Sequence, residues 1–245
     1  MAALRREATQ IVTELVKAQT RASWGELVAV LGELEAVFDA LARALSLPPG
    51  ACRGMLRALP RMKVIVPCDF EETRKATHAA ADVWGPVYIR FGRENVPVVT
   101  TPETPFVFGK GLQMREGGDV ALIACGVMVY EALEAAETLA KLGVEARVIN
   151  LHTVKPIDRE IIQQAAEDCG AIVTAEEHQI NGGLGGAVAE VIVRSNPVPM
   201  EFVAVDDRFG QSGAPDELMA AFGLKSRDIV AASERVLKRK LTRVF

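Results

Sequence analysis

The sequence predicts an α/β fold: a C-terminal, mostly parallel sheet flanked by helices, preceded by a partial strand–helix–strand unit and a helical N-terminal segment. Three observations predict it. Short apolar runs alternate with amphipathic stretches over residues 106–245, one strand–helix–strand pattern stands alone in residues 55–105, and residues 1–54 read as helix. Buried strands that alternate with amphipathic helices indicate a parallel sheet with right-handed crossovers.

The N-terminal segment carries one regular apolar stripe. Its members alternate spacings of four and three residues, which places them on one face of a helix: Leu27, Leu31, Leu34, Phe38, Leu41 and Leu45. Pro48, Pro49 and Gly50 then end the helix. Such a stripe either packs on its own protein or pairs with another helix.

Residues 55–105 read as a strand, a helix and a second strand. Residues 63–67 form an apolar run, and Asp69 with Glu72 three residues later is a capping box that opens a helix through about residue 83. Residues 86–91 are the next strand, and a Pro/Thr-rich linker follows at 96–105. Since a single unit of this kind cannot bury both faces of its sheet, it must pack on another part of the protein.

Residues 106–245 hold a complete alternating pattern. Strands are expected at 120–124, 146–150, 171–175 and 202–205. Helices are expected at 129–142, 158–167, 185–194, 215–222 and 226–240. This pattern supplies helices for both faces of the sheet.

Composition and charge exclude some classes of function. The 245 residues are 49% hydrophobic and 24% charged, as in an ordinary globular domain. A net charge of −4 without a basic patch excludes a general nucleic-acid binder. The most apolar stretch, 27–47, contains Glu33, Glu35, Asp39 and Arg43, so no membrane span is expected.

Cysteines and histidines show no metal or disulfide pattern. Four separated cysteines form no CxxC pair, and three histidines have no ligand spacing. The N-terminus has no secretory signal, so we expect a cytoplasmic protein with reduced thiols.

Polar residues follow the predicted strands at their carboxyl ends, where ligands bind in open α/β sheets. They are His152, Lys155, Glu176, Glu177, His178, Asp206, Asp207 and Arg208. We single out His152, Glu177 and His178 as a possible interface or ligand edge, although solvated loops explain such residues equally well. No Ser/His/Asp triad or zinc motif is present.

Two further features have alternative explanations. The glycines of residues 181–186 (NGGLGG) open a helix and could present N–H groups to an anion, but they do not fit a nucleotide motif and tight packing explains them as well. Arg90 and Arg93 flank the end of the strand at 86–91. A guanidinium at a strand end is suited to a phosphate, with surface ion pairing as the alternative.

Several ordered motifs resemble the end of transketolase. They are MLRALPRMKVIVPCDFEETRKA, GPVYIRFGRENVP, DVALIACGVMVYEALEAAETLAKLGVEARVINLHTVKPID, EEHQINGGLGGAVAEV and DRFGQSGAPDELMAAFGL. The resemblance covers about residues 55–240 and is closest to C-terminal sections encoded as separate genes, with 1-deoxyxylulose-5-phosphate synthase more distant. It implies a helical segment at 1–54 outside the resemblance, the remnant of a pyrimidine-binding domain at 55–105 and a transketolase C-terminal domain at 106–245.

The resemblance also implies a chemistry. Transketolases use thiamine diphosphate and Mg²⁺ to move a two-carbon ketol unit between phosphosugars, a reaction of the pentose phosphate pathway, and they act as dimers. Arg93 stands where the family binds the substrate phosphate. The family's activating glutamate and its diphosphate and magnesium motif have no counterpart in this sequence. The resemblance therefore implies an N-terminal transketolase section or a homodimer as partner, no cofactor bound by this chain alone, and no activity alone.

The alternative is a non-catalytic dimerisation or docking domain, related to the C-terminal domain of 2-oxo-acid dehydrogenase β subunits. Whether the chain acts as part of an enzyme is left open between these two interpretations.

Overall fold

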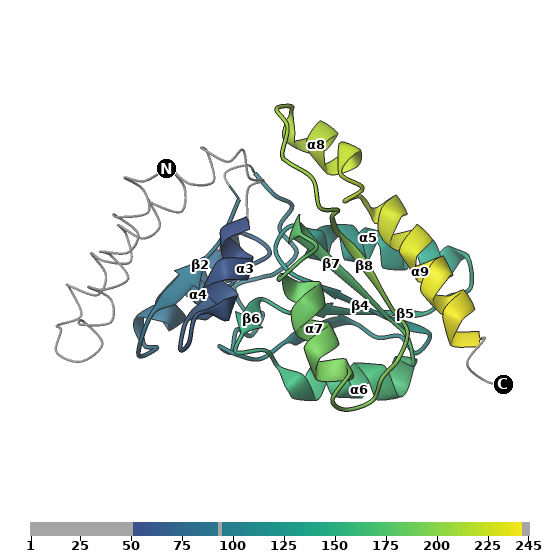
Figure 1. The fold of residues 1–245 in the computed structure, drawn as a ribbon, viewed down its shortest axis with the longest axis horizontal. Coiled ribbons are helices and arrows are strands. Elements are labelled where there is room, and N and C mark those ends of the chain that lie inside the picture. The colour runs from purple at the N-terminus through teal and green to yellow at the C-terminus, as the bar shows by residue number, and fades with distance from the viewer. Residues whose placement is uncertain (1–50, 93–94, 242–245) are drawn as a thin grey trace.

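The computed structural model describes residues 51–92 and 95–241. Two sheets of unequal size lie side by side (Figure 1). The larger has five strands in the order β3-β5-β4-β7-β8, and the smaller has three in the order β2-β1-β6. The predicted N-terminal helix with its leucine stripe lies outside the described residues.

The larger sheet is mostly parallel, as predicted. β4 (Val120–Ala124), β5 (Ala146–Asn150), β7 (Ile172–Gln179) and β8 (Met200–Val205) all run in one direction. β7 extends beyond its predicted end because it resumes pairing with β8 after an irregularity. An antiparallel edge strand beside β5, β3 (Leu112–Arg115), was not predicted because it is short and only partly buried.

Helices cover both faces of the larger sheet (Figure 1). α5 (Met128–Lys141) and α9 (Ser226–Leu241) pack on one face, and α6 (Arg159–Cys169) and α7 (Leu184–Ile192) on the other. α8 (Pro215–Ala221) follows β8 near the carboxyl ends of the strands. Because β4 is central, its residues are buried in alternation against the two layers, which explains an uninterrupted apolar run.

The smaller sheet contains the predicted strand–helix–strand unit. β1 (Lys63–Ile65) and β2 (Val87–Ile89) are parallel and are joined by α4 (Phe70–Ala81). β6 (Thr153–Lys155) pairs antiparallel with β1, so residues expected in a loop form a strand of this sheet instead. α3 (Ala51–Ala58), which was not predicted as a separate element, contacts β1 and β7.

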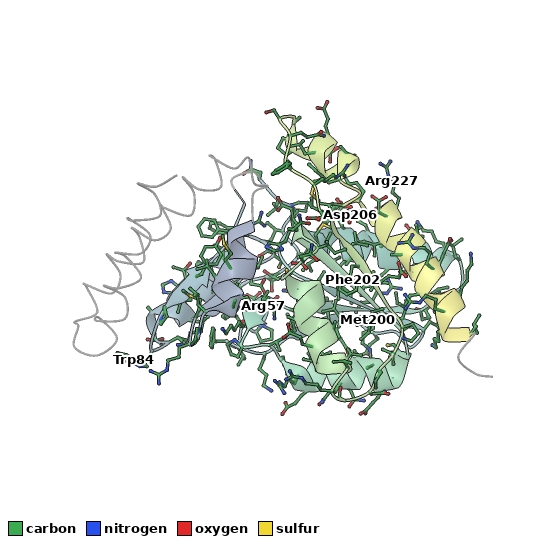
Figure 2. All side chains as sticks on the ribbon, viewed as in Figure 1. Arg57, Trp84, Met200, Phe202, Asp206 and Arg227 are labelled. Carbon is green, nitrogen blue, oxygen red and sulfur yellow. The ribbon has the colours of Figure 1, made fainter. Side chains whose placement is uncertain are left out.

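Close packing explains the glycine-rich segment at the start of α7. A Cβ on Gly185 would lie 2.1 Å from Cδ1 of Phe202, and one on Gly183 would lie 2.2 Å from Oε2 of Glu176. Figure 2 labels Phe202 on β8 beside α7. The absence of side chains therefore lets α7 approach the sheet closely.

Gly185→Ala should lower the free energy of unfolding by about 1–3 kcal/mol, because the Phe202 ring must leave its packed position. Gly186 gives a control in the same helix, where a Cβ would lie 3.7 Å from Nη2 of Arg57, an ordinary contact distance. Gly186→Ala should be neutral or stabilising, since alanine favours helix. Urea unfolding measures both variants, and equal stabilities would contradict the packing explanation.

Candidate functional site

A cleft of about 1020 Å³ opens where the two sheets meet. Its walls come from residues that follow the carboxyl ends of β1, β2, β4 and β8, from Glu177 of β7, and from α4, α5 and α8. Open α/β sheets bind ligands and partners at this edge. The cleft is therefore the candidate functional site.

The lining of the cleft is largely apolar and its rim is exposed. Phe70, Phe91 and Val98 line it and are largely exposed to solvent. Tyr130 and Phe222 contribute further aromatic surface from α5 and from the residue after α8. An apolar cleft with a few placed charges suits either a ligand or a segment of another polypeptide.

An ion pair joins two residues that line the cleft and that come from different sheets. Nη1 of Arg90, directly after β2, donates to Oε2 of Glu177 in β7 over 3.0 Å. The side chains are 14% and 34% exposed, respectively. Burial alone lowers the pKa of Arg90, but the charge of Glu177 and the hydrogen bond to it outweigh burial, so the pKa is raised. The guanidinium therefore stays charged and links the two sheets.

Asp69 anchors one wall of the cleft. It is the N-cap of α4 and accepts a hydrogen bond from the Glu72 N–H at 2.9 Å, which confirms the predicted cap. It also accepts from the N–H groups of Val99 and Thr100 and from the Thr100 hydroxyl. Burial raises the pKa of Asp69, but these hydrogen bonds outweigh it and the pKa is lowered.

Glu72 differs from the predicted capping box. Its carboxylate accepts from the Cys68 N–H at 2.7 Å and from Nδ2 of Asn150 at 2.7 Å, and so ties α4 to the end of β5. Burial raises its pKa, and the hydrogen bonds offset this only in part. Oδ1 of Asn150 accepts no hydrogen bond from the described residues. Asn150 was not predicted as a site residue. The feature of the sequence that could have identified it is its position as a polar residue at the end of an apolar strand.

The three predicted edge residues have different environments. Glu177 lines the cleft, whereas His152 and His178 are each only 1% exposed. Nδ1 of His178 lies 2.5 Å from the Gln179 carbonyl oxygen. The role of these three residues as an interface or ligand edge stays a prediction.

His152 belongs to the junction between the sheets. Its ring stacks on Phe106 with centroids 4.2 Å apart, Nδ1 lies 2.9 Å from the Thr153 hydroxyl, and its carbonyl accepts from the Val66 N–H at 2.7 Å. Burial lowers the pKa of His152 to about 4, although the charge of Asp158 acts in the opposite direction. The imidazole is therefore neutral near pH 7.

The N-terminus of α7 is occupied by a carboxylate of the chain itself. Oε1 of Glu176 accepts from the Gly185 N–H at 2.9 Å. A carboxylate at a helix N-terminus interacts favourably with the helix dipole. The glycine-rich segment thus serves helix capping and close packing, and the structure gives the anion-site interpretation no support.

Two other polar residues of the predicted edge, Lys155 and Arg208, hold structural elements in place. Lys155 donates to the Arg57 and Leu59 carbonyls at the end of α3. The Arg208 guanidinium lies over the Phe222 ring, 4.4 Å from its centroid, and donates to the Ala221 carbonyl.

Arg93 lies outside the described residues, but its described neighbours Gly92 and Asn95 line the cleft. Within residues 51–92 and 95–241, no group of three or more His, Cys, Asp and Glu side chains is arranged to hold a metal ion. In the same ranges no helix has the length and apolar character needed to cross a membrane.

The fold and cleft define an α/β protein with a cleft at the carboxyl edge of its C-terminal sheet, next to a second, smaller sheet. Residues 109–229 match the family model described as "Transketolase, C-terminal domain". Residues 109–229 thus correspond to the C-terminal domain of transketolases, and the similarity of the chain to transketolase subunits extends over 76% of its length.

Relatives and a solved structure agree with this placement. The chain is 44% identical over 186 residues to the 6-deoxy-6-sulfo-D-fructose transketolase subunit of Clostridium sp. (strain MSTE9), covering 76% of this chain and 58% of that protein. It is 38% identical over 186 residues to a subunit of the apulose-4-phosphate transketolase of Phocaeicola vulgatus, covering 76% of this chain and 59% of that protein. The chain thus spans less than two thirds of these relatives.

A solved structure described as "Split gene transketolase, inactive beta4 tetramer" superposes with a TM-score of 0.75 at 46% identity. The superposition covers 76% of this chain and 61% of that chain. The α/β fold predicted for the C-terminal part is thereby confirmed.

The burial of His152 predicts a pH-dependent stability. In the folded state the pKa of His152 is about 4, below the ordinary value of 6.5. The stability that comes from burying the neutral imidazole is therefore lost as the pH falls from 6.5 toward 4. Between pH 7 and pH 4.5, the wild type should lose roughly 2–3 kcal/mol more unfolding free energy than His152→Gln.

Urea unfolding at both pH values measures this difference. His78→Gln, at an exposed position on α4, is the control and should show the wild-type dependence. A wild-type dependence in His152→Gln as well would contradict the assignment.

Proposed function

We propose that this chain is the C-terminal section of a thiamine-diphosphate-dependent transketolase and works with an N-terminal section on a second polypeptide. The assembled enzyme transfers a two-carbon ketol unit between phosphosugars. The observation that carries the proposal is the match of residues 109–229 to the transketolase C-terminal domain, next to a cleft at the carboxyl edge of two sheets. In this proposal the reaction belongs to pentose phosphate metabolism and takes place in the cytoplasm.

The described residues do not fit the cofactor themselves. They offer no cluster of carboxylates or histidines for Mg²⁺, which needs oxygen ligands in near-octahedral geometry. The one helix N-terminus with a glycine-rich approach in the described part of the chain, that of α7, already holds Glu176. In this proposal the partner section therefore holds thiamine diphosphate and Mg²⁺, and no step of the reaction is assigned to the residues described.

The names of the relatives support the proposal that this chain works with a second polypeptide. Two are called subunits of a transketolase, and the solved structure is described as the product of a split gene and as a tetramer that is inactive. A largely apolar cleft with an exposed aromatic rim is the kind of surface that a second polypeptide covers. A homodimer, with or without the N-terminal section, is part of the same proposal.

The second candidate function is a non-catalytic dimerisation or docking domain. The solved structure favours it, because the protein in that structure is described as an inactive tetramer and such a section can therefore assemble without activity. The two candidates differ in what an N-terminal section adds: activity for the first, assembly alone for the second.

The isolated chain should bind no thiamine diphosphate in the presence of Mg²⁺ and should have no transketolase activity. Mixing it with the N-terminal section of a two-chain transketolase should produce ketol transfer that depends on thiamine diphosphate and Mg²⁺. Calorimetry measures binding, and a coupled assay measures transfer, with each section alone as control. Micromolar cofactor binding by the isolated chain would contradict this arrangement, and a complex without activity would favour the docking domain.

In the assembled enzyme, Arg93→Ala should raise KM for phosphorylated sugars roughly 10- to 100-fold, because it removes a charge-assisted contact to the phosphate. Unphosphorylated analogues should be affected much less. Arg93→Lys should recover part of the loss, since a point charge replaces a planar fork. A sulfonated sugar should respond as the phosphorylated one does if Arg93 recognises a terminal anion in general.

Arg90 is a poor control for this measurement because it pairs with Glu177. Arg74, on the exposed side of α4 and paired with Glu71, is a better one. Steady-state kinetics decide the matter: equal effects of Arg93→Ala on phosphorylated and unphosphorylated substrates would make Arg93 a structural residue.

A further inference from the structure

Strand β2 leaves one edge of the smaller sheet open among the described residues. The sheet has the order β2-β1-β6, so β2 pairs with a described strand on one side only. The Pro86 carbonyl accepts from β1 and the Arg90 N–H donates to β1, so alternate residues of this segment face β1. The N–H and C=O groups of Val87 and Ile89, which lie between them, therefore point toward the open edge.

The open edge lacks most of the features by which proteins protect an exposed strand. Those features include a proline or a charged side chain on the edge and a bulge. Pro86 faces β1, so its missing N–H is not at the open edge. Val87 and Ile89 are uncharged, β-branched residues that favour strands, and their pairing with β1 is regular. An edge of this kind is suited to pairing with another strand.

The partner that this segment fits is a second copy of the same strand. A two-fold axis at Tyr88 sets the two strands antiparallel, with Val87 of one copy opposite Ile89 of the other. Both residues point their backbone groups to the open edge, so each such pair exchanges both of its N–H···O bonds. Tyr88, whose backbone faces β1, then occupies the non-hydrogen-bonded position on the axis.

Two exposed aromatic side chains flank the strand and support the same register. Trp84 is 82% exposed and Phe91 is 60% exposed, and Figure 2 shows Trp84 at the periphery of the molecule. The register places Phe91 opposite Gly85 and Trp84 opposite Gly92 of the other copy, where no side chain competes for space. An aromatic ring beside a glycine of the neighbouring strand covers the exposed backbone there. The rings also add apolar area that a strand of three residues does not provide alone.

We propose that two copies of this chain associate by antiparallel pairing of their β2 strands across a two-fold axis at Tyr88, which joins their smaller sheets into one continuous sheet. This inference rests on the homodimer of the proposed function and names its contact. None of the three residues of β2 lines the cleft, so the pairing leaves the cleft accessible to an N-terminal section.

Sedimentation velocity of the full chain tests this contact, and the wild type should be a dimer. Ile89→Pro removes an N–H at the open edge without removing a bond to β1. It should raise the Kd of the dimer at least about thirtyfold, because one hydrogen bond is lost from each copy across the two-fold axis. Ile89→Ala is the matched control: it loses the same side chain but keeps the N–H, so its Kd should stay close to the wild-type value.

Cross-linking gives a second measurement that does not depend on how well Ile89→Pro folds. The two Cα atoms of Tyr88 should lie about 4.5 Å apart in the dimer, a separation that a disulfide can span. Tyr88→Cys should therefore form an intermolecular disulfide under mild oxidation. Thr138→Cys, at an exposed position of α5, should not.

A wild-type Kd in Ile89→Pro, or a Tyr88→Cys chain that forms no intermolecular disulfide, would overturn the inference and leave the proposed homodimer in place. A monomeric wild type would instead refute the homodimer and the inference with it. The proposed partnership with an N-terminal section would stand in both cases.

Discussion

Two parallel strands of three residues and one helix cannot enclose a hydrophobic core, and this constraint organises the molecule. The strand–helix–strand unit completes its sheet with β6, which comes from residues after β5 of the larger sheet. Val66 donates to the His152 carbonyl, and Gly126 donates to the Val66 carbonyl, so both sheets meet at their carboxyl ends. Val64 and Val66 then share a buried cluster with Ile123 of β4.

That junction explains where the candidate site lies. Because both sheets present their carboxyl ends to the same region, the segments after β1, β2, β4 and β8 surround one cleft. The polar contacts there serve to hold segments at fixed positions. Asp69 holds the linker, Glu72 holds Asn150, and Arg90 holds Glu177. Each is a buried or half-buried charge with a partner, as the low dielectric of an interior requires.

Much of the fold could be predicted from the sequence because the larger sheet follows local rules. β4 and β5 have the predicted bounds, and five helices were found to within about two residues, since buried parallel strands and amphipathic helices have distinct periodicities. β3 and β6 were missed because neither is an apolar run, and each is a strand only through pairing with a distant segment. Tertiary context decides such elements.

The site was predictable in outline and not in detail. Strand order indicates that polar residues gather at the carboxyl edge. Glu177 was selected in this way and lines the cleft, and its role stays a prediction. Whether a residue there faces the cleft or the interior depends on side-chain direction and on what packs above it, which explains why His152 and His178 are buried. The partnership of Arg90 and Glu177 joins residues 87 positions apart, and no local pattern encodes it.

In the proposed assembly, the walls of the cleft contact an N-terminal transketolase section. Hydrogen–deuterium exchange of the full chain, with and without such a section, tests it most directly. Slower exchange is expected at residues 66–73 and 95–98 in the complex, with no change in α6, none of whose residues lines the cleft. Unchanged exchange in the cleft wall, with protection confined to α6 or α9, would contradict it.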